Sequence, residues 1–283
     1  MDHSHLYTTP ETESLAEDKA EVRQRHESNR AGWNEGAARY SEGLEKTIAF
    51  LRGGGSSLHR LEKANLGDLK AWCKTAVHLQ CASGEDTLSL WNEGVAEVVG
   101  VDISDVHIAN AQKTSDALNA PARWYRCDIL DTPAELNETA DLVYTGQGAL
   151  CWLHDLDGWA RVVYRLLKPD GIVHILDDHP TSWLFDQEKS VVMAAGISYF
   201  GYTESNQGWG PTYIGELDKP REELAVKYER LWTLAEIFQA LTKAGLTVTH
   251  LGEHADEYWE AFPYLPPEEK AKLPMTFTMM ATK

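Results

Sequence analysis

The sequence has little cysteine and no long hydrophobic run. Its 283 residues include four cysteines, which are scattered and form no C-x-x-C pair. This pattern argues against a disulfide framework and against a bound metal. No apolar stretch approaches the ~20 residues that a membrane-spanning helix needs. The N-terminus lacks an apolar core flanked by basic residues, so we expect no secretory signal, no membrane partner and a cytoplasmic location.

Positive charge is also scarce. The chain has 26 lysines and arginines against 44 aspartates and glutamates, which gives a formal net charge of −18. This charge opposes binding to DNA, RNA or anionic membranes, so we expect a small-molecule partner, neutral or cationic, and no nucleic acid. Hydrophobic and charged contents of 43% and 25% are ordinary for globular proteins. The length suits one large domain with an insertion.

The most informative stretch is residues 76–102. An apolar run ending at Leu79 predicts a buried strand, residues 80–84 predict a tight turn, and a helix follows. A second apolar run ends at Asp102, 18 positions after Gly84. Such strand–turn–helix–strand units bind ligands at the carboxyl ends of their strands. The spacing suits a carboxylate that accepts hydrogen bonds from ribose hydroxyls.

Strands and helices continue to alternate beyond this unit. Further strands are predicted at 122–127, 141–144 and 172–176, with helices at 104–118 and 157–167. The first of these helices has Ser104 as its expected N-cap. After a helix at 231–244, two final strands are expected at 246–251 and 275–281. The pattern predicts an α/β fold with a doubly wound sheet.

Two segments depart from this alternation, and with them we divide the chain into parts. Residues 1–20 are polar and predicted to be flexible, and residues 21–70 are predicted to form a helical cap. Residues 71–283 then form the ligand-binding domain. Within it, residues at about 180–225 are rich in aromatics and glycine, which suits an inserted lid with some strand at 197–202.

The turn itself contains one glycine, Gly84, and is not the G-x-G-x-x-G dinucleotide fingerprint. The run L-Q-C-x-x-G-x-D-T-L, followed by V-x-G-V-D-I-S, resembles class I S-adenosylmethionine (SAM) methyltransferases, in particular a bacterial branch acting on small molecules. Their usual motif is D-x-G-x-G-x-G, from which His78, Gln80 and Ala82 depart. The resemblance implies a Rossmann-like seven-stranded sheet, with the last strand antiparallel between the fifth and sixth. By itself, the turn is compatible with any nucleotide-binding βαβ unit or a purely structural turn.

The resemblance also implies a SAM site. The turn would bind the methionine carboxylate through backbone N–H groups, Gly146 would offer a carbonyl to the ammonium, and Asp102 would bind the ribose. Two isoleucines and Asp128 would hold the adenine. Trp33 and Tyr40, seven residues apart on one helix face, would cover the methionine end, although packing alone also explains such a pair. The cofactor-binding residues predicted in this way are Trp33, Tyr40, Gln80, Ala82, Gly84, Asp102, Ile103, Asp128, Ile129 and Gly146.

Methyl transfer from a sulfonium needs a base only when the acceptor atom carries a proton at neutral pH. His179 follows the fifth predicted strand and is our candidate catalytic base, with His154 second. Each is also explained as an ordinary loop histidine.

The leading interpretation is a SAM-dependent methyltransferase that transfers a methyl group to a small molecule by in-line displacement. An NAD-dependent oxidoreductase is an alternative, weakened by the missing glycines. A non-catalytic SAM-binding protein is another, and the altered turn favours it. Titration with a nicotinamide cofactor separates the methyltransferase from the oxidoreductase. Turnover separates the methyltransferase from the non-catalytic SAM-binding protein.

Overall fold

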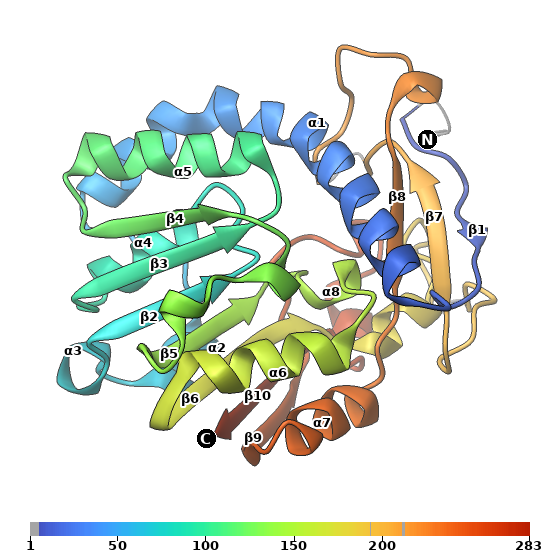
Figure 1. Ribbon diagram of the computed structural model, residues 1–283. Coiled ribbons are helices and arrows are strands. Elements are labelled where there is room, and N and C mark those ends of the chain that lie inside the picture. The colour runs from blue at the N-terminus through green and yellow to red at the C-terminus, as the bar shows by residue number, and fades with distance from the viewer. Residues whose placement is uncertain (1–5, 193, 211–212) are drawn as a thin grey trace.

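The computed structural model describes residues 6–192, 194–210 and 213–283. A seven-stranded sheet with strand order β4-β3-β2-β5-β6-β10-β9 forms its centre (Figure 1). Neighbours among the first five strands pair in parallel, and β10 runs antiparallel to both β6 and β9. The predicted fold, with its antiparallel last strand between the fifth and sixth, is therefore confirmed. The strands are β2 (Thr75–Leu79), β3 (Glu97–Asp102), β4 (Ala122–Arg126), β5 (Ala140–Gly146), β6 (Leu167–Asp178), β9 (Thr247–His254) and β10 (Thr276–Thr282).

Helices pack on both faces of this sheet. Ser104 caps the helix after β3 as predicted, since its hydroxyl accepts a hydrogen bond from the N–H of His107 at 3.2 Å. None of the helices in the described ranges is both long and apolar enough to cross a membrane. The helices are α1 (Lys19–Arg52), α2 (Arg60–Leu66), α3 (Leu69–Trp72), α4 (Glu85–Asn92), α5 (Asp105–Leu118), α6 (Leu156–Leu166), α7 (Leu234–Lys243) and α8 (Pro267–Lys270). The short 3₁₀ turns in the described residues are η1 (Ile129–Asp131), η2 (Ala134–Leu136), η3 (Leu150–Trp152), η4 (Pro180–Leu184) and η5 (Arg221–Glu223).

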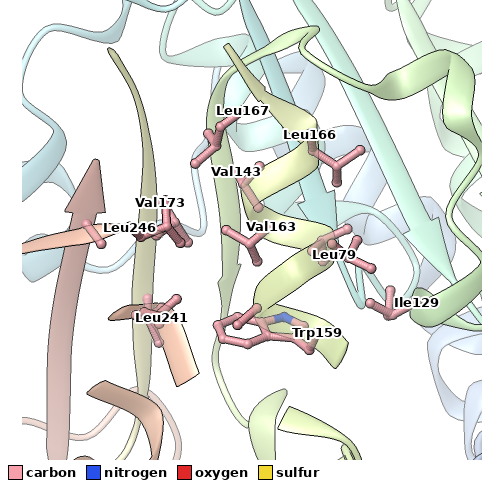
Figure 2. Packing of buried hydrophobic residues seen from close by; sticks show 14 of the residues in the cluster. Leu79, Ile129, Val143, Trp159, Val163, Leu166, Leu167, Val173, Leu241 and Leu246 are labelled. Carbon is pink, nitrogen blue, oxygen red and sulfur yellow. The ribbon is translucent and has the colours of Figure 1, made fainter. Parts of the chain in front are cut away.

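The main core lies between the sheet and helices α6 and α7. Figure 2 shows Trp159 of α6 among aliphatic side chains, including Leu79 of β2 and Val143 of β5. Trp159 has no exposed surface, and burying a side chain of this size contributes several kcal/mol, about 25 cal/mol per Å² of apolar area. A second cluster, which includes Leu69, Leu90 and others, covers the opposite face. Burial on both faces explains why these strands are continuous apolar runs.

A second, three-stranded antiparallel sheet has the order β1-β7-β8. Its strands are β1 (Glu11–Thr12), β7 (Thr203–Gln207) and β8 (Val226–Arg230). In Figure 1 it stands opposite the arrowheads of β3 and β4, across the carboxyl edge of the main sheet. The sequence predicted a strand at 197–202, but the strand lies at 203–207, and β8 was not foreseen. Strand boundaries depend on the partner strand, which sequence periodicity does not show.

The N-terminal segment belongs to this second sheet. The Thr8 N–H donates to Gln207 O at 2.9 Å, and the Glu13 N–H donates to Thr203 O at 2.8 Å. Where we expected a flexible terminus over residues 1–20, the chain from residue 6 therefore forms an edge of the small sheet, because β7 offers it unpaired backbone groups. Residues 1–5 lie outside the described residues.

Helix α1 bridges the two sheets. It crosses from α5 to β8 in Figure 1 and packs against both elements. The buried Asn29 side chain pairs with the backbone of Tyr228, donating to its carbonyl at 2.8 Å and accepting from its N–H at 2.6 Å. The Asn29 amide thus satisfies backbone hydrogen-bonding groups at the edge of β8, as a neighbouring strand would.

Candidate active site

The turn after β2 has a glycine-like backbone at three alternate positions. The φ angles are 61° at Gln80, 43° at Ala82 and 82° at Gly84. Left-handed conformations are rare for residues with a Cβ and cost of order 1–3 kcal/mol each. These are the positions at which the usual methyltransferase motif has glycine. The backbone form of the motif is therefore kept although two of its glycines are replaced.

Asp102 at the end of β3 holds this turn in place. One carboxylate oxygen accepts from the Ala82 N–H and the other from the Ser104 N–H, each at 2.8 Å. Burial raises the pKa of Asp102 to about 6, against the effect of these backbone hydrogen bonds. Each oxygen keeps a further lone pair for a ligand.

Gly84 could not be replaced without movement of its neighbours. A Cβ at this position would lie 2.6 Å from the Trp124 ring and 2.9 Å from the Cβ of Ala111. Close packing of the turn on α5 and β4 thus accounts for the one glycine that the sequence keeps. Gly146 ends β5, and a Cβ there would clash with the backbone carbonyl of Leu176.

Asp128 follows β4 and already has side-chain partners. Its carboxylate lies 2.7 Å from a guanidinium nitrogen of Arg23 and 2.8 Å from Nδ1 of His26. It also accepts from the Leu130 N–H at 2.9 Å. Burial alone would raise the pKa of Asp128, but these partners outweigh burial and lower it. Its carboxylate is therefore ionised at neutral pH.

Helix α1 places the two predicted aromatic residues, Trp33 and Tyr40, among other aromatic side chains. The Trp33 ring centroid lies 4.8 Å from that of Trp209 and 5.2 Å from that of Trp152. The Tyr40 ring meets the ring of His107 edge-on, at 4.9 Å. Side chains from four parts of the chain thus form one aromatic wall.

All ten predicted cofactor-binding residues line a single cavity of about 1340 Å³. They come from α1, the turn after β2 and the ends of β3, β4 and β5, so the tertiary structure gathers residues up to 113 positions apart. The ten are Trp33, Tyr40, Gln80, Ala82, Gly84, Asp102, Ile103, Asp128, Ile129 and Gly146.

The predicted catalytic base does not belong to this cavity. His179 is buried, accepts from the Thr181 N–H at 3.2 Å as the cap of η4, and bonds Glu253 at 2.8 Å through Nε2. Its ring faces Phe277, away from the cavity lining. Burial lowers the pKa of His179, although the bond to Glu253 opposes this. Both ring nitrogens of His179 thus have partners within the protein, and the catalytic role predicted for it stays a prediction. His154, the second candidate, is also outside the lining.

Asp178, the residue just before His179, does line the cavity, and sequence reasoning missed it. Both of its carboxylate oxygens face Nε1 of Trp259, at 3.1 and 3.3 Å. Burial raises the pKa of Asp178 to about 7, and the charge of Asp177 adds to this. Asp177 turns the other way and accepts from the N–H groups of residues 148–150 at 2.9–3.1 Å. The sequence held a signal for this difference, because successive strand residues such as Asp177 and Asp178 point to opposite faces of the sheet.

The second sheet adds charged residues to the same cavity: Glu204, Lys227 and Glu229. The 180–210 segment and the connector between β9 and β10, residues 255–275, complete the cavity lining. Their aromatic lining residues are Trp183, Phe185, Tyr202, Trp209, Tyr258, Trp259 and Tyr264. The predicted lid region therefore contributes to the site, together with the unforeseen strand β8.

Comparison with known proteins agrees with this geometry. Residues 76–171 match the family model described as a methyltransferase domain, and the sheet order is that of class I SAM-dependent methyltransferases. Residues 76–171 are therefore similar to a methyltransferase domain, and the chain has the class I, Rossmann-like fold. No curated protein sequence matches it.

Solved structures of the same fold cover most of the chain. A SAM-dependent methyltransferase from Mesorhizobium loti is 20% identical with a TM-score of 0.56, and the match covers 81% of this chain and 99% of that one. A putative SAM-dependent methyltransferase from Listeria monocytogenes is 18% identical with a TM-score of 0.56, covering 78% and 97%. Geranyl diphosphate C-methyltransferase from Streptomyces coelicolor A3(2), solved with S-adenosylhomocysteine, is 15% identical with a TM-score of 0.51, covering 80% and 77%.

Proposed function

We propose that this protein is a SAM-dependent methyltransferase that acts on a small molecule. The observation that carries the proposal is the single cavity that collects every residue expected to bind SAM, beside a turn with the glycine-type backbone of the family motif. We further propose that residues 71–283 form the SAM-binding domain, that α1 caps it, and that residues 180–225 form a lid.

The residues present fit SAM. The Gln80 side chain donates to Ala149 O at 2.7 Å, while its Oε1 is buried without a hydrogen-bond partner among the described residues. Such an orphaned acceptor suits an ammonium group. We expect Asp102 to bind the ribose hydroxyls and the backbone N–H groups of the turn to bind the methionine carboxylate. Bound there, SAM would supply an activated methyl group on a sulfonium.

The protein's own task is then to hold the acceptor in line and to exclude water. The aromatic side chains of the lid and connector, Trp183 and Trp259 among them, surround the remaining part of the cavity. Their rings suit a flat or cationic acceptor. Most of the charged groups that line this part are carboxylates, which favours a neutral or cationic acceptor over an acidic one.

Calorimetric titration with S-adenosylhomocysteine tests the proposal. We expect micromolar binding, about −8 kcal/mol, and far weaker binding of NADH. Comparable affinity for both would favour the oxidoreductase alternative, and no binding of S-adenosylhomocysteine would overturn the proposal. Binding of SAM without methyl transfer to any acceptor would identify a non-catalytic SAM-binding protein.

A further inference from the structure

We propose that the methyl acceptor is an amine, and that Asp178 binds its nitrogen and accepts its proton. This inference rests on the proposed methyltransferase function and names the substrate class of the same cavity. It depends on three features that lie around one space: a buried carboxylate at the end of β6, a negatively charged wall on the second sheet, and aromatic rings between them.

The first feature is the position of Asp178. It ends β6, next to β5 and at the same edge of the sheet as Gly146 and the SAM turn. Trp259 holds both carboxylate oxygens from one side. The Tyr258 hydroxyl also lines the cavity, is buried, and lies beside the Asp178 carboxylate. An ammonium group, which has several N–H donors, would satisfy both oxygen-bearing side chains.

The second feature is the wall made by β7 and β8. The Asn206 amide donates to Glu229 at 2.9 Å and to Glu204 at 3.3 Å. Burial raises the pKa of both glutamates, and the charge of Glu229 helps to raise that of Glu204 to about 7. Two carboxyl groups that repel each other in a cavity are stabilised by a bound cation.

Lys227 lies opposite Asn206 in the same pair of strands but does not reverse the charge of the wall. Its ammonium donates to Asn206 Oδ1 at 2.7 Å and to the carbonyl of Gly208, and it lies 4.4 Å from the Trp209 ring centroid. Burial lowers its pKa to about 8. The absence of a side chain at Gly32 makes room for it, since a Cβ there would lie 2.6 Å from Lys227 Cγ. The Lys227 ammonium is already bound by groups of the protein, so it offers no site for an anionic acceptor.

The third feature is a chain of aromatic rings across the cavity. Tyr213 lies 5.8 Å from Trp259 and 6.0 Å from Trp209, and Trp209 lies 4.8 Å from Trp33. The rings come from α1, from the lid and from the connector, so they surround a ligand from several sides. Aromatic faces attract ammonium groups, and the attraction grows when water is excluded.

These groups support a balanced reaction. An alkylammonium acceptor gives one N–H proton to the Asp178 carboxylate, which leaves a lone pair on nitrogen. That pair forms the new N–C bond with the methyl carbon while the C–S bond breaks and its electrons go to sulfur. Positive charge thus passes from sulfur to nitrogen, and the products are an N-methylammonium and a neutral thioether. The raised pKa of Asp178 suits a proton acceptor near neutral pH.

Matched acceptor probes test this inference. We would titrate 2-phenylethylamine, 2-phenylethanol and 2-phenylethanethiol, with tryptamine and tryptophol as a larger pair, into the protein saturated with S-adenosylhomocysteine. We expect each amine to bind at least ~10-fold more tightly than its alcohol. Asp178→Asn should reduce amine affinity ~10-fold and reduce methyl transfer from labelled SAM by ~10²–10⁴-fold. Glu97→Gln, an exposed site at the start of β3 and outside the cavity, is the control and should change neither.

The outcomes separate the two proposals. Failure to bind S-adenosylhomocysteine overturns the methyltransferase function itself. Normal binding of it, with alcohols or thiols bound or methylated as well as amines, overturns only the amine acceptor. Amine binding unchanged by Asp178→Asn removes Asp178 from the site. If that variant does not fold, Glu229→Gln on the opposite wall serves instead, with an expected loss of amine affinity and unchanged affinity for S-adenosylhomocysteine.

Discussion

The carboxylate of Asp102 and the backbone N–H of Ala82 are joined by a 2.8 Å hydrogen bond, which ties the end of β3 to the turn after β2. The residue expected to bind the ribose therefore also shapes the loop expected to bind the methionine carboxylate. Both halves of the proposed SAM site depend on one side chain.

Replacement of Asp102 tests this double role. Asp102→Ala should weaken binding of S-adenosylhomocysteine by about 1.5–3 kcal/mol, the scale of a lost charge-assisted hydrogen bond. Calorimetry measures the change. Glu97→Ala, an exposed site at the other end of the same strand, should leave affinity unchanged. Equal affinities of wild type and Asp102→Ala would exclude Asp102 from the site.

The strained turn predicts an unusual effect of glycine. Because Ala82 has a φ of 43°, Ala82→Gly should raise the free energy of unfolding by about 0.5–1 kcal/mol, since glycine adopts this conformation without a Cβ clash. Urea denaturation measures it. Ala117→Gly, on the exposed face of α5, should instead lower stability by about 1 kcal/mol. A comparable loss in both variants would show that the turn carries no strain at Ala82.

His179 and Asp178 are adjacent and should behave oppositely. His179→Asn should keep methyl transfer within about two-fold of wild type and lose about 1 kcal/mol of stability, because the capping bond to Thr181 is structural. Asp178→Asn should lose turnover instead. Steady-state assays and thermal unfolding of both variants make the comparison. Strong loss of turnover in His179→Asn, with affinity for S-adenosylhomocysteine intact, would return the base to His179.

The pH dependence of stability should also identify Asp178. Burial raises its pKa from an ordinary 3.8 to about 7 in the folded protein, so folding takes up a proton between these values. Stability from this group is therefore lost as pH rises from about 4 to about 7, and the penalty is complete above 7. Asp178→Asn should raise the melting temperature at pH 8 and change it little at pH 4. Thermal scans across this range measure the difference, and parallel curves for both proteins would contradict the assignment.

The sequence alone determined the order of the elements and most of the proposed SAM site. Apolar runs and helix periodicity are local properties, so they predicted the strands around Leu79 and Asp102 and the helix that carries Trp33 and Tyr40. Motif spacing is local as well. It placed residues at strand ends, and parallel strands bring those ends to one edge of the sheet.

Only the tertiary structure decided the acceptor half of the cavity. Strand β8 became visible through its pairing with β7 and its contact with Asn29, residues that are far away in sequence. Asp178 ends β6 and lines the cavity, whereas His179 lies just beyond the strand and caps η4. Long-range strand pairing leaves no periodic trace in the sequence, which is why the charged wall opposite the proposed proton acceptor emerged only from the fold.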